Sequence, residues 1–343
     1  MFEKSTLVFC LIGAGRIGAI HARNITLHGG ARVKYVVDVD PDAAKKLATA
    51  CGAEVSGVTA ALADPHVNAV LIASSTDTHA ELIQACARAG KAVFCEKPLD
   101  LDITRARASA AAAKQAGIHL AVGFNRRCDP AFSRLKREIL SGALGQVEVV
   151  TIISRDPSPP SASYVTRSGG LFRDMMIHDL DMARWLLAEE PVTVFARGSA
   201  LADESIGAAG DIDTAVVVLE TSSGKLCHIT NSRRCVYGYD QRIEVFGSQG
   251  VVRADNVTAT SVARGGATGF VTEPALPFFL ERYAAAYRIE LEAFVTLLRH
   301  EPAADVLVAS LATADDGLRA LALADAAQSS LETGQPVRMQ VTL

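Results

Sequence analysis

The feature that most constrains this chain is a short apolar run that leads directly into a glycine-rich turn. Leu7–Ile12 is continuously apolar, as expected of a strand buried on both faces of a parallel sheet. It is followed by Gly13-x-Gly15-x-x-Gly18 and by a helical pattern over residues 16–28. Glycines at these positions permit a tight turn, close approach of the backbone to a pyrophosphate, and close packing of helix on strand. The segment therefore predicts a dinucleotide-binding turn.

Strand and helix patterns alternate through the first third of the chain. Asp40 and Pro41 suit the N-cap and first turn of one of the helices. Further predicted strands cover residues 33–38, 69–73, 92–95 and 120–123, and further predicted helices cover residues 41–51, 79–89 and 102–116. Alternation of this kind predicts an α/β fold with a doubly wound parallel sheet.

The pattern changes after Asn125, where strands predominate and two of the connections look like hairpins. Predicted strands cover residues 147–154, 192–197, 215–220, 226–230, 242–246 and 251–254, and predicted helices cover residues 131–140, 170–187, 283–299 and 305–332. The turns at residues 221–224 and 247–250 would join neighbouring strands. We predict a dinucleotide-binding domain over residues 1–124. Residues 125–343 would form an α/β domain for substrate binding and oligomerisation, with a large, mostly antiparallel open sheet.

Asp38 bears on which dinucleotide the turn would bind. It ends the second predicted strand, 20 residues after Gly18, where a carboxylate would bind both ribose hydroxyls. The next residue is Val39 rather than an arginine, so nothing nearby would hold a 2′-phosphate. NAD is therefore favoured over NADP. The alternative interpretation is a tight turn followed by a helix-capping aspartate.

Lys97 lies in the tripeptide Glu96-Lys97-Pro98, at the carboxyl end of the predicted strand 92–95. In open parallel sheets that edge holds the ligand crevice. Pro98 restricts the backbone of Lys97 to extended conformations, which would direct the side chain. An ammonium beside a substrate hydroxyl would stabilise a developing alkoxide. The alternative is a solvated loop lysine paired with Glu96.

The predicted helix 170–187 carries Asp174, His178 and Asp181 at spacings that place them on one face. Apolar residues at helical spacing occupy the opposite face. A histidine with an ordinary pKa of about 6.5 suits proton transfer near neutral pH. His178 is thus a candidate general base, and Asp174, one turn away, could orient it. The alternative is a solvated polar face. Trp185 lies on the same face as His178, which argues against a fully hydrated face.

Composition excludes several classes of function. The formal net charge is −4 and no run of Lys and Arg is present, so we predict no nucleic-acid and no membrane partner. The seven cysteines contain no Cys-x-x-Cys pair, which favours free thiols in a reducing compartment. No apolar stretch approaches the roughly 18 residues of a membrane span. We predict a soluble cytoplasmic protein. His79, His119 and His228 lack ligand spacing, so no metal is predicted.

These motifs together resemble the glucose–fructose oxidoreductase/inositol dehydrogenase/rhizopine-catabolism (Gfo/Idh/MocA) family, and within it the inositol 2-dehydrogenases. The glycine-rich turn and Glu96-Lys97-Pro98 are family-wide features. The segments that resemble the inositol group are Gly123-Phe-Asn-Arg-Arg127, Ser154-Arg-Asp-Pro157, the stretch from Ser168 to Asp181, Asn231-Ser-Arg-Arg234 and Tyr237-Gly-Tyr-Asp-Gln-Arg242. The resemblance covers essentially the whole chain. It implies a Rossmann domain followed by an α/β domain that assembles as a homotetramer through its sheet.

The resemblance also implies roles for individual residues. Lys97, Asp174 and His178 would be the catalytic group. The implied NAD-binding residues are Gly13, Gly15, Arg16, Ile17, Gly18, Asp38, Ser74, Thr76, His79, Glu96 and Lys97. Besides the catalytic group, the implied polyol contacts are Arg127, Asp156, Asp181 and Tyr237. Asp156 departs from some inositol dehydrogenases, which have Asn at that position, and this leaves the stereoisomer open.

The function predicted from the sequence is NAD-dependent oxidation of a secondary alcohol on a cyclic polyol. The first candidate is myo-inositol, oxidised at C2 to the 2-keto inositol, an intermediate of inositol catabolism. The same chemistry on scyllo-inositol, another inositol isomer or an aldose such as glucose is an alternative. A non-enzymatic NAD-binding sensor is a second alternative of a different class, since a fold alone does not determine function.

Overall fold

The computed structural model describes residues 6–299 and 305–339. They form two compact units, each made of two stretches of the chain. The first unit comprises the chain up to Cys128 together with Ala285–Arg319. The second comprises Asp129–Ala284 together with the chain after Arg319. This differs from the predicted division into 1–124 and 125–343, chiefly because residues 285–319 return to the first unit.

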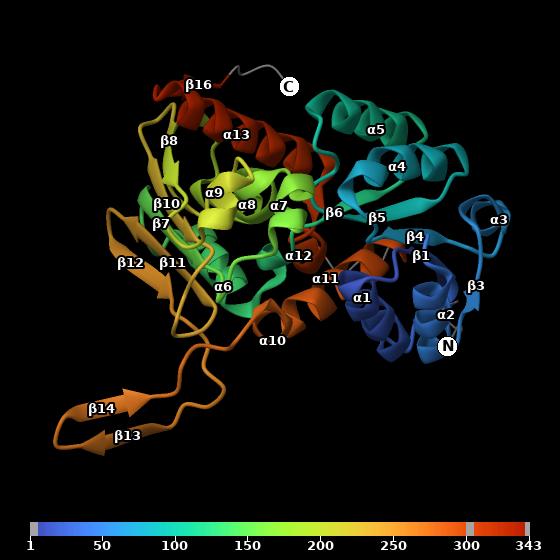
Figure 1. Cartoon of the computed structure of the whole chain (residues 1–343), viewed down its shortest axis with the longest axis horizontal. Helices are drawn as coiled ribbons and strands as arrows, with labels where there is room; N and C mark the ends of the chain where they lie inside the picture. Colours follow the sequence, from blue (N-terminus) through green and yellow to red (C-terminus); the bar gives the residue numbers. More distant parts are fainter. Residues whose placement is uncertain (1–5, 300–304, 340–343) are drawn as a thin grey trace. The chain divides into compact units, whose positions relative to one another are not determined.

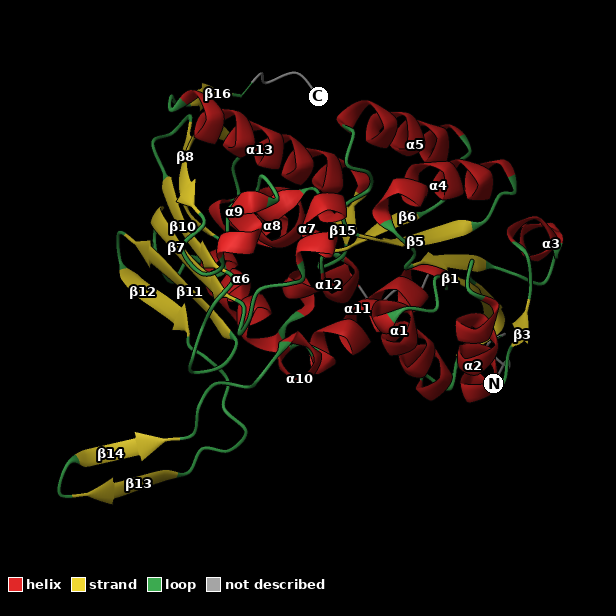
Figure 2. Ribbon diagram, in the orientation of Figure 1, coloured by secondary structure: helices red, strands yellow, loops and turns green. Residues whose placement is uncertain are grey.

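The first unit is built on a seven-stranded sheet in the order β15-β6-β5-β4-β1-β2-β3 (Figures 1 and 2). Its strands are β1 (Leu7–Ile12), β2 (Ala31–Val37), β3 (Glu54–Val55), β4 (Ala69–Ile72), β5 (Ala92–Glu96), β6 (Leu120–Gly123) and β15 (Ala312–Thr313). All neighbouring strands are parallel except β15, which pairs antiparallel with β6. The doubly wound parallel sheet predicted from the alternating pattern is confirmed.

The helices of the first unit cover both faces of this sheet, with α4 and α5 on one face and α1, α2 and α11 on the other (Figure 1). Their bounds are α1 (Arg16–Leu27), α2 (Pro41–Cys51), α3 (Val58–Ala63), α4 (His79–Arg88), α5 (Ile103–Gln115), α11 (Ala284–Leu298) and α12 (Asp305–Val308), with short 3-10 turns at Thr76–Thr78 and Asn125–Cys128. The predicted N-cap is confirmed, because the carboxylate of Asp40 accepts hydrogen bonds from the N–H groups of Asp42 and Ala43.

Residues 285–319 belong to the first unit because α11 completes its core. Phe294 packs against Phe94 and Phe9, with ring centroids 5.6 and 6.3 Å apart. Leu291 belongs to the same buried cluster. β15 then extends the sheet beside β6. The local sequence pattern predicted the α11 helix but carries no signal for which sheet it covers.

The second unit is built on a seven-stranded sheet in the order β12-β11-β7-β10-β9-β8-β16. Its strands are β7 (Val147–Arg155), β8 (Pro191–Ser199), β9 (Thr214–Thr221), β10 (Leu226–Ser232), β11 (Asp240–Gly247), β12 (Gly250–Ala254) and β16 (Val337–Arg338). Only β7 and β10 run parallel; the other neighbours are antiparallel. The predicted mostly antiparallel sheet is confirmed, and so are the two hairpins, β9–β10 and β11–β12.

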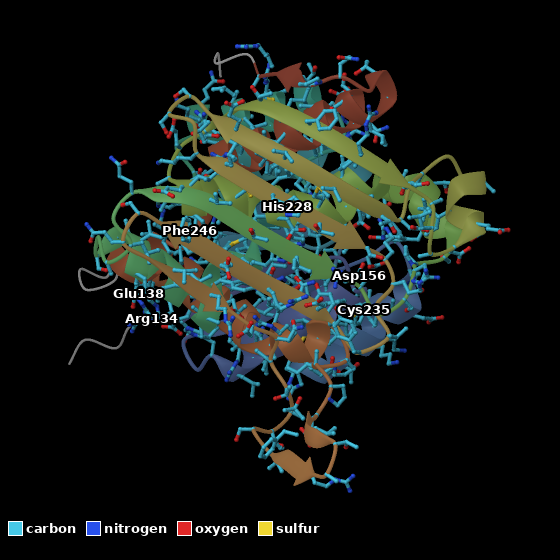
Figure 3. All side chains as sticks on the ribbon, turned by 90° about the vertical axis from the view of Figure 1, so that its left-hand side faces the viewer. Arg134, Glu138, Asp156, His228, Cys235 and Phe246 are labelled. Atoms are coloured by element: carbon cyan, nitrogen blue, oxygen red, sulfur yellow. The ribbon has the colours of Figure 1, made fainter. Side chains whose placement is uncertain are left out.

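Helices lie on one face of the second sheet, and the other face is open (Figures 1 and 3). They are α6 (Pro130–Leu140), α7 (Ala162–Ser168), a π-helical turn (Phe172–Met176), α8 (Ile177–Leu187), α9 (Glu204–Ala208), α10 (Phe279–Arg282) and the later part of α13 (Ala314–Thr333). Two predicted helices require correction. The helix predicted over residues 170–187 begins with the π-helical turn, and the one predicted over residues 305–332 is divided into α12, β15 and α13.

A two-stranded hairpin, β13 (Ala263–Gly266) and β14 (Gly269–Thr272), projects from the second unit (Figure 2). All of its residues are exposed. No strand was predicted from the sequence over these residues. Among residues 6–299 and 305–339, none of the helices combines the length and apolar character needed to cross a membrane.

Candidate active site

The glycine-rich turn joins β1 to α1, and its three glycines meet three different requirements. Gly13 has a φ of +106°, and a Cβ at this position would overlap the backbone carbonyl of Ala73. A Cβ on Gly18 would overlap the carbonyl oxygen of Gly13, so α1 packs this closely only with glycine there. Nothing lies within 4 Å of a Cβ built on Gly15. The backbone is therefore open to a ligand at Gly15, as a pyrophosphate requires.

The first turn of α1 is suited to an anion. No side chain caps the helix N-terminus at Gly15, and the first turn contains no acidic residue. Arg16 is exposed and Ile17 is half-buried. The uncapped N–H groups and the positive end of the helix dipole both favour a phosphate at this position.

Asp38 directly follows β2 and is held beside the glycine-rich turn. One carboxylate oxygen accepts a hydrogen bond from the N–H of Ala14 at 2.5 Å, and the other accepts one from the N–H of Asp40 at 2.8 Å. Val39 is fully exposed next to it. A carboxylate has about four acceptor positions, so Asp38 can still accept hydrogen bonds from ribose hydroxyls. The turn, the helix N-terminus and Asp38 together fit NAD.

The loop after β4 was predicted to border the cofactor through Ser74, Thr76 and His79. The Ser74 and Thr78 hydroxyls lie 2.7 Å apart, and Thr76 is half-buried. The ring of His79 is fully buried. Its Nδ1 lies 2.8 Å from the carbonyl oxygen of Pro98, and its Nε2 lies 3.1 Å from the carbonyl oxygen of Ser74. Cofactor contacts for these three residues stay predictions.

Lys97 follows the last residue of β5 and is half-buried. The peptide bond between Lys97 and Pro98 is cis. Glu96 is buried, and its Oε1 lies 2.7 Å from Nε2 of His21. The predicted cofactor contact of Glu96 stays a prediction, while its observed partner is a histidine on α1. Lys97 thus stands at the carboxyl end of a central strand of the parallel sheet, where ligands bind in such folds.

Asp174 and His178 lie in the second unit, on either side of the junction between the π-helical turn and α8. Both side chains are half-buried. Met176 and Leu180, which belong to the predicted apolar stripe, are completely buried. π-helical turns occur frequently at functional sites because they change the direction of the side chains they carry.

Two partners of Asp174 were not predicted from the sequence. The hydroxyl of Tyr164 donates a hydrogen bond to Oδ1 of Asp174 at 2.9 Å, and Nη2 of Arg233 donates one to Oδ2 at 3.2 Å. Arg233 is only 2% exposed. It lies in the motif Asn231-Ser-Arg-Arg234 at the end of β10, but nothing local to that motif indicates contact with a residue of the π-helical turn. The carboxylate of Asp174 is therefore held by a buried cation and a hydroxyl.

Arg127 was predicted to contact the polyol, and the structure places it in the first unit. It is buried in the 3-10 turn after β6, and its Nη2 lies 2.9 Å from Oδ1 of Asp316. Asp181 lies in the second unit and is buried on α8, with Nη1 of Arg184 3.8 Å from its Oδ1. The polyol contacts of both residues stay predictions.

Asp156 and Tyr237 lie in the second unit, at one end of its sheet. The N–H of Asp156 donates to the carbonyl of Ser232 at 2.9 Å, and its side chain is half-buried (Figure 3). The hydroxyl of Tyr237 donates to Oδ2 of Asp240 at 2.6 Å and accepts from Nη1 of Arg155 at 2.6 Å. The hydroxyl of Tyr237 is thus part of an ion cluster, and its polyol contact stays a prediction.

The pKa of Asp240 reflects this ion cluster. Burial alone would raise the pKa of its carboxyl, but hydrogen bonds from Arg242 and Tyr237 outweigh burial and lower it below the ordinary value. Asp240 is therefore an ionised acceptor that orients Tyr237. Tyr237 and Arg242 are only two or three residues from Asp240 in the chain, whereas its contact with Arg155 depends on the pairing of β7 with β11.

The predicted site residues divide between the two units. The glycine-rich turn, Asp38, the Ser74 loop, Lys97 and Arg127 belong to the first, and Asp156, Asp174, His178, Asp181 and Tyr237 belong to the second. His21, the partner of Glu96, was missed. The sequence feature that could have identified His21 is its helical spacing from Gly18 and Ile25, which places it on the buried face of α1. No cluster of potential metal ligands occurs in the part of the chain that the structure describes.

Comparisons with known proteins match both units. Residues 7–124 match an oxidoreductase family with an NAD-binding Rossmann fold, and residues 132–253 match the GFO/IDH/MocA C-terminal domain. The inositol 2-dehydrogenase of Rhizobium meliloti is 49% identical over 95% of this chain and 97% of its own length. The myo-inositol 2-dehydrogenase of Thermotoga maritima is 46% identical over 96% of this chain and 98% of its own length.

A solved structure adds a bound cofactor to this comparison. The crystal structure of scyllo-inositol dehydrogenase from Lactobacillus casei, with bound NAD(H) and scyllo-inositol, superposes with a TM-score of 0.88. The two chains are 28% identical, and the match covers 97% of this chain and 99% of the other.

Proposed function

This chain belongs to the GFO/IDH/MocA family of NAD-dependent oxidoreductases, and we propose that it oxidises myo-inositol at C2 to the 2-keto inositol. The observation that carries the substrate assignment is the identity of 46–49% over nearly the full length to two inositol 2-dehydrogenases. The observation that supports the chemistry is the presence of Lys97, Asp174 and His178 in the positions described above. The alternative substrates are scyllo-inositol, another inositol isomer and an aldose such as glucose.

NAD would be held by the glycine-rich turn, the N-terminus of α1 and Asp38, and when bound it supplies the acceptor for the hydride that leaves the ring carbon. The protein supplies position and charge. His178 removes the proton of the reacting hydroxyl. Lys97 donates a hydrogen bond to the same oxygen and stabilises its developing negative charge. Asp174, itself held by Arg233 and Tyr164, orients His178 and stabilises its cationic form.

We also propose the residues that bind the substrate, the oligomeric state and the cellular location. Arg127, Asp156, Asp181 and Tyr237 would bind the remaining ring hydroxyls, with Asp156 deciding among stereoisomers. The chain would assemble as a homotetramer through the open sheet face of the second unit. Seven free cysteines, six of them buried, fit a cytoplasmic enzyme of inositol catabolism.

The direct test is the initial rate of NADH formation with myo-inositol, scyllo-inositol, D-chiro-inositol and glucose, each with NAD and with NADP. Strong turnover of myo-inositol with NAD is the expected result. If only another polyol is oxidised, the proposed roles of Lys97 and His178 still hold. Asp156 would then be the residue to examine for the choice of substrate. Binding of NAD without turnover of any polyol would contradict the proposal and favour a sensor.

Substitution of the catalytic group gives the second test. Lys97→Ala and His178→Ala should each lower kcat about 10²–10⁴-fold, because each removes a group that acts on the reacting oxygen. The dissociation constant of NAD, measured by fluorescence titration, should change little. Lys46→Ala, on the exposed face of α2, is the matched lysine control. Equal losses of turnover and NAD affinity in a folded Lys97→Ala protein would contradict the assigned role.

A further inference from the structure

Lys97 is flanked in the chain by two residues that each contact a buried histidine. On one side, Oε1 of Glu96 lies 2.7 Å from Nε2 of His21. On the other side, the carbonyl oxygen of Pro98 lies 2.8 Å from Nδ1 of His79. Both histidines are only 1% exposed. They come from different helices, α1 and α4, so the lysine-bearing turn is held from two directions.

His79 makes contacts that only a donor can make. Both of its ring nitrogens face carbonyl oxygens, one of Pro98 and one of Ser74. A carbonyl oxygen can only accept, so each contact requires a proton on the facing nitrogen. A neutral ring would donate to one of the two carbonyls and an imidazolium would donate to both. His79 therefore links the loop after β4 to the turn after β5.

His21 holds Glu96 in a closed environment. Its ring packs edge-on against Phe94 and Tyr287, with centroids 5.4 and 5.6 Å apart. On its other side the Glu96 carboxylate borders Gly123 of β6, where a Cβ would lie 2.9 Å from Oε2. A buried carboxylate requires a compensating partner. The direction of the Glu96 side chain is thus determined by His21 and by the absence of a side chain at Gly123.

We propose that His21 and His79 are positioning residues that hold Lys97 in the orientation needed for alkoxide stabilisation; this inference rests on the proposed function. Neither histidine has to touch the substrate. His21 lies on α1, whose N-terminus is the phosphate site, and His79 begins α4 directly after the Ser74 loop. The elements proposed to hold NAD are therefore also the elements that hold the lysine, which couples cofactor placement to the placement of Lys97.

The test is a double-mutant cycle between His79→Ala and Lys97→Ala in the full-length protein. His79→Ala alone should lower kcat on the order of 10- to 100-fold, the effect of a misplaced catalytic group. In the Lys97→Ala background, activity is measured with methylamine supplied in solution, because a free ammonium is not held by the turn. There the same substitution should cost less than about twofold. Equal losses in both backgrounds would overturn the proposal.

Two conservative variants keep the test informative if His79→Ala does not fold. In His79→Gln one amide donor remains, so kcat should lie between those of the wild type and His79→Ala. His21→Gln retains a donor for Glu96 and enters the same cycle. His66→Ala, an exposed histidine of the first unit, is the matched control. Circular dichroism confirms folding, and NAD titration separates loss of cofactor binding from loss of kcat.

The outcomes separate this inference from the proposed function. If the wild type oxidises no polyol, or if Lys97→Ala retains full turnover, the proposed function fails. If Lys97→Ala loses turnover while folded His21→Gln and His79→Gln or His79→Ala match the wild type, only the positioning roles fail. If the His21 and His79 variants instead melt at a lower temperature and keep the wild-type kcat when assayed well below it, both histidines would be structural residues only.

Discussion

At the scale of single residues, two carboxylates of the candidate site are held by partners that lie far away in the sequence. Glu96 contacts His21, 75 residues away, and Asp174 contacts Arg233, 59 residues away. Asp38 instead accepts two backbone N–H groups, of Ala14 and Asp40. Each partner limits where the carboxylate oxygens can lie, so Glu96 and Asp174 are directed by contacts outside their own motifs.

Asp38 leads to a prediction about cofactor choice. Its carboxylate would accept ribose hydroxyls and repel a 2′-phosphate. We expect Asp38→Ser to raise KM for NAD about tenfold, equivalent to the roughly 1.4 kcal/mol of a charged hydrogen bond, and to lower KM for NADP. Steady-state kinetics with both cofactors measure the change. Asp42→Ser, an exposed aspartate in the first turn of α2, is the control, and an unchanged cofactor ratio in Asp38→Ser would contradict the assignment.

At the scale of elements, the π-helical turn distinguishes the observed helix from the predicted one. Gly169 and Gly170 both have positive φ values, and the N–H of Leu171 donates to Oδ1 of Asp211 at 3.2 Å. These contacts determine how the chain enters the turn that carries Asp174.

Gly170 allows this arrangement to be tested. It has a φ of +80°, and a Cβ would lie 2.8 Å from Oδ1 of Asp211. We expect Gly170→Ala to lower the free energy of unfolding by about 1–3 kcal/mol and to lower kcat, because Asp174 follows in the same turn. The control is Gly142→Ala, with a φ of +77° and nothing within 4 Å of its Cβ. Urea denaturation and initial rates measure both effects; equal kcat values in the two variants would contradict the link to Asp174.

At the scale of the whole molecule, α13 begins in the first unit and ends in the second. Its start is bound to the first unit through the contact between Asp316 and Arg127. Gly317 adds a close contact there, since a Cβ would lie 3.0 Å from Leu99. The pair Arg127–Asp316 therefore ties the returning segment 285–319 to the turn after β6.

This pair predicts how stability depends on pH. Burial alone would raise the pKa of Asp316, but the positive charge of Arg127 and hydrogen bonds from Thr313 outweigh it and hold the pKa well below its usual value. A carboxyl whose pKa is lower in the folded state stabilises the fold above its unfolded pKa of about 3.9. That contribution is lost as the pH falls through the unfolded pKa towards the folded one.

Asp316→Asn removes the titrating group and should flatten the fall in the free energy of unfolding between about pH 5 and pH 3. Urea denaturation at a series of pH values measures the slope. Asp315→Asn, whose side chain is 71% exposed on the same helical turn, should behave as the wild type. Identical slopes for Asp316→Asn and the wild type would show that the pair makes no such contribution.

The open sheet face carries the proposal of a homotetramer. Figure 3 faces this side of the second unit, with His228 on β10 and Phe246 on β11 labelled. The exposed apolar residues on its strands are Val216, Val218, Leu226, Phe246 and Val251. Apolar side chains in such numbers on one sheet face are typical of an interface.

A charge placed in that face should disrupt the assembly. We expect Val218→Asp to convert the proposed tetramer into smaller species, since an interface would bury the new carboxylate without a partner. Light scattering coupled to size exclusion measures the mass. Val39→Asp makes the same change at a fully exposed valine in the first unit and should leave the mass unchanged. A monomeric wild type would rule out the tetramer.

The positions of the candidate site residues could be predicted from the sequence wherever they depend on a local motif. Gly13, Gly15 and Gly18 occupy the conformations expected of them, and Asp38 and Lys97 lie at the carboxyl ends of their strands. The distant partners of Glu96 and Asp174 could not be predicted. Contacts between elements depend on how those elements pack, and a single sequence contains no direct record of that packing.

The sequence by itself determined most of the elements, because apolar periodicity, caps and tight turns arise from interactions among residues a few positions apart. It thereby determined both sheets, the glycine-rich turn and the cap at Asp40. Only the tertiary structure decided that residues 285–319 return to the first unit, that the helix of Asp174 begins with a π-helical turn, and that His21 faces Glu96. Those outcomes depend on contacts between residues tens to hundreds of positions apart, where shape and charge are matched only after the elements have packed.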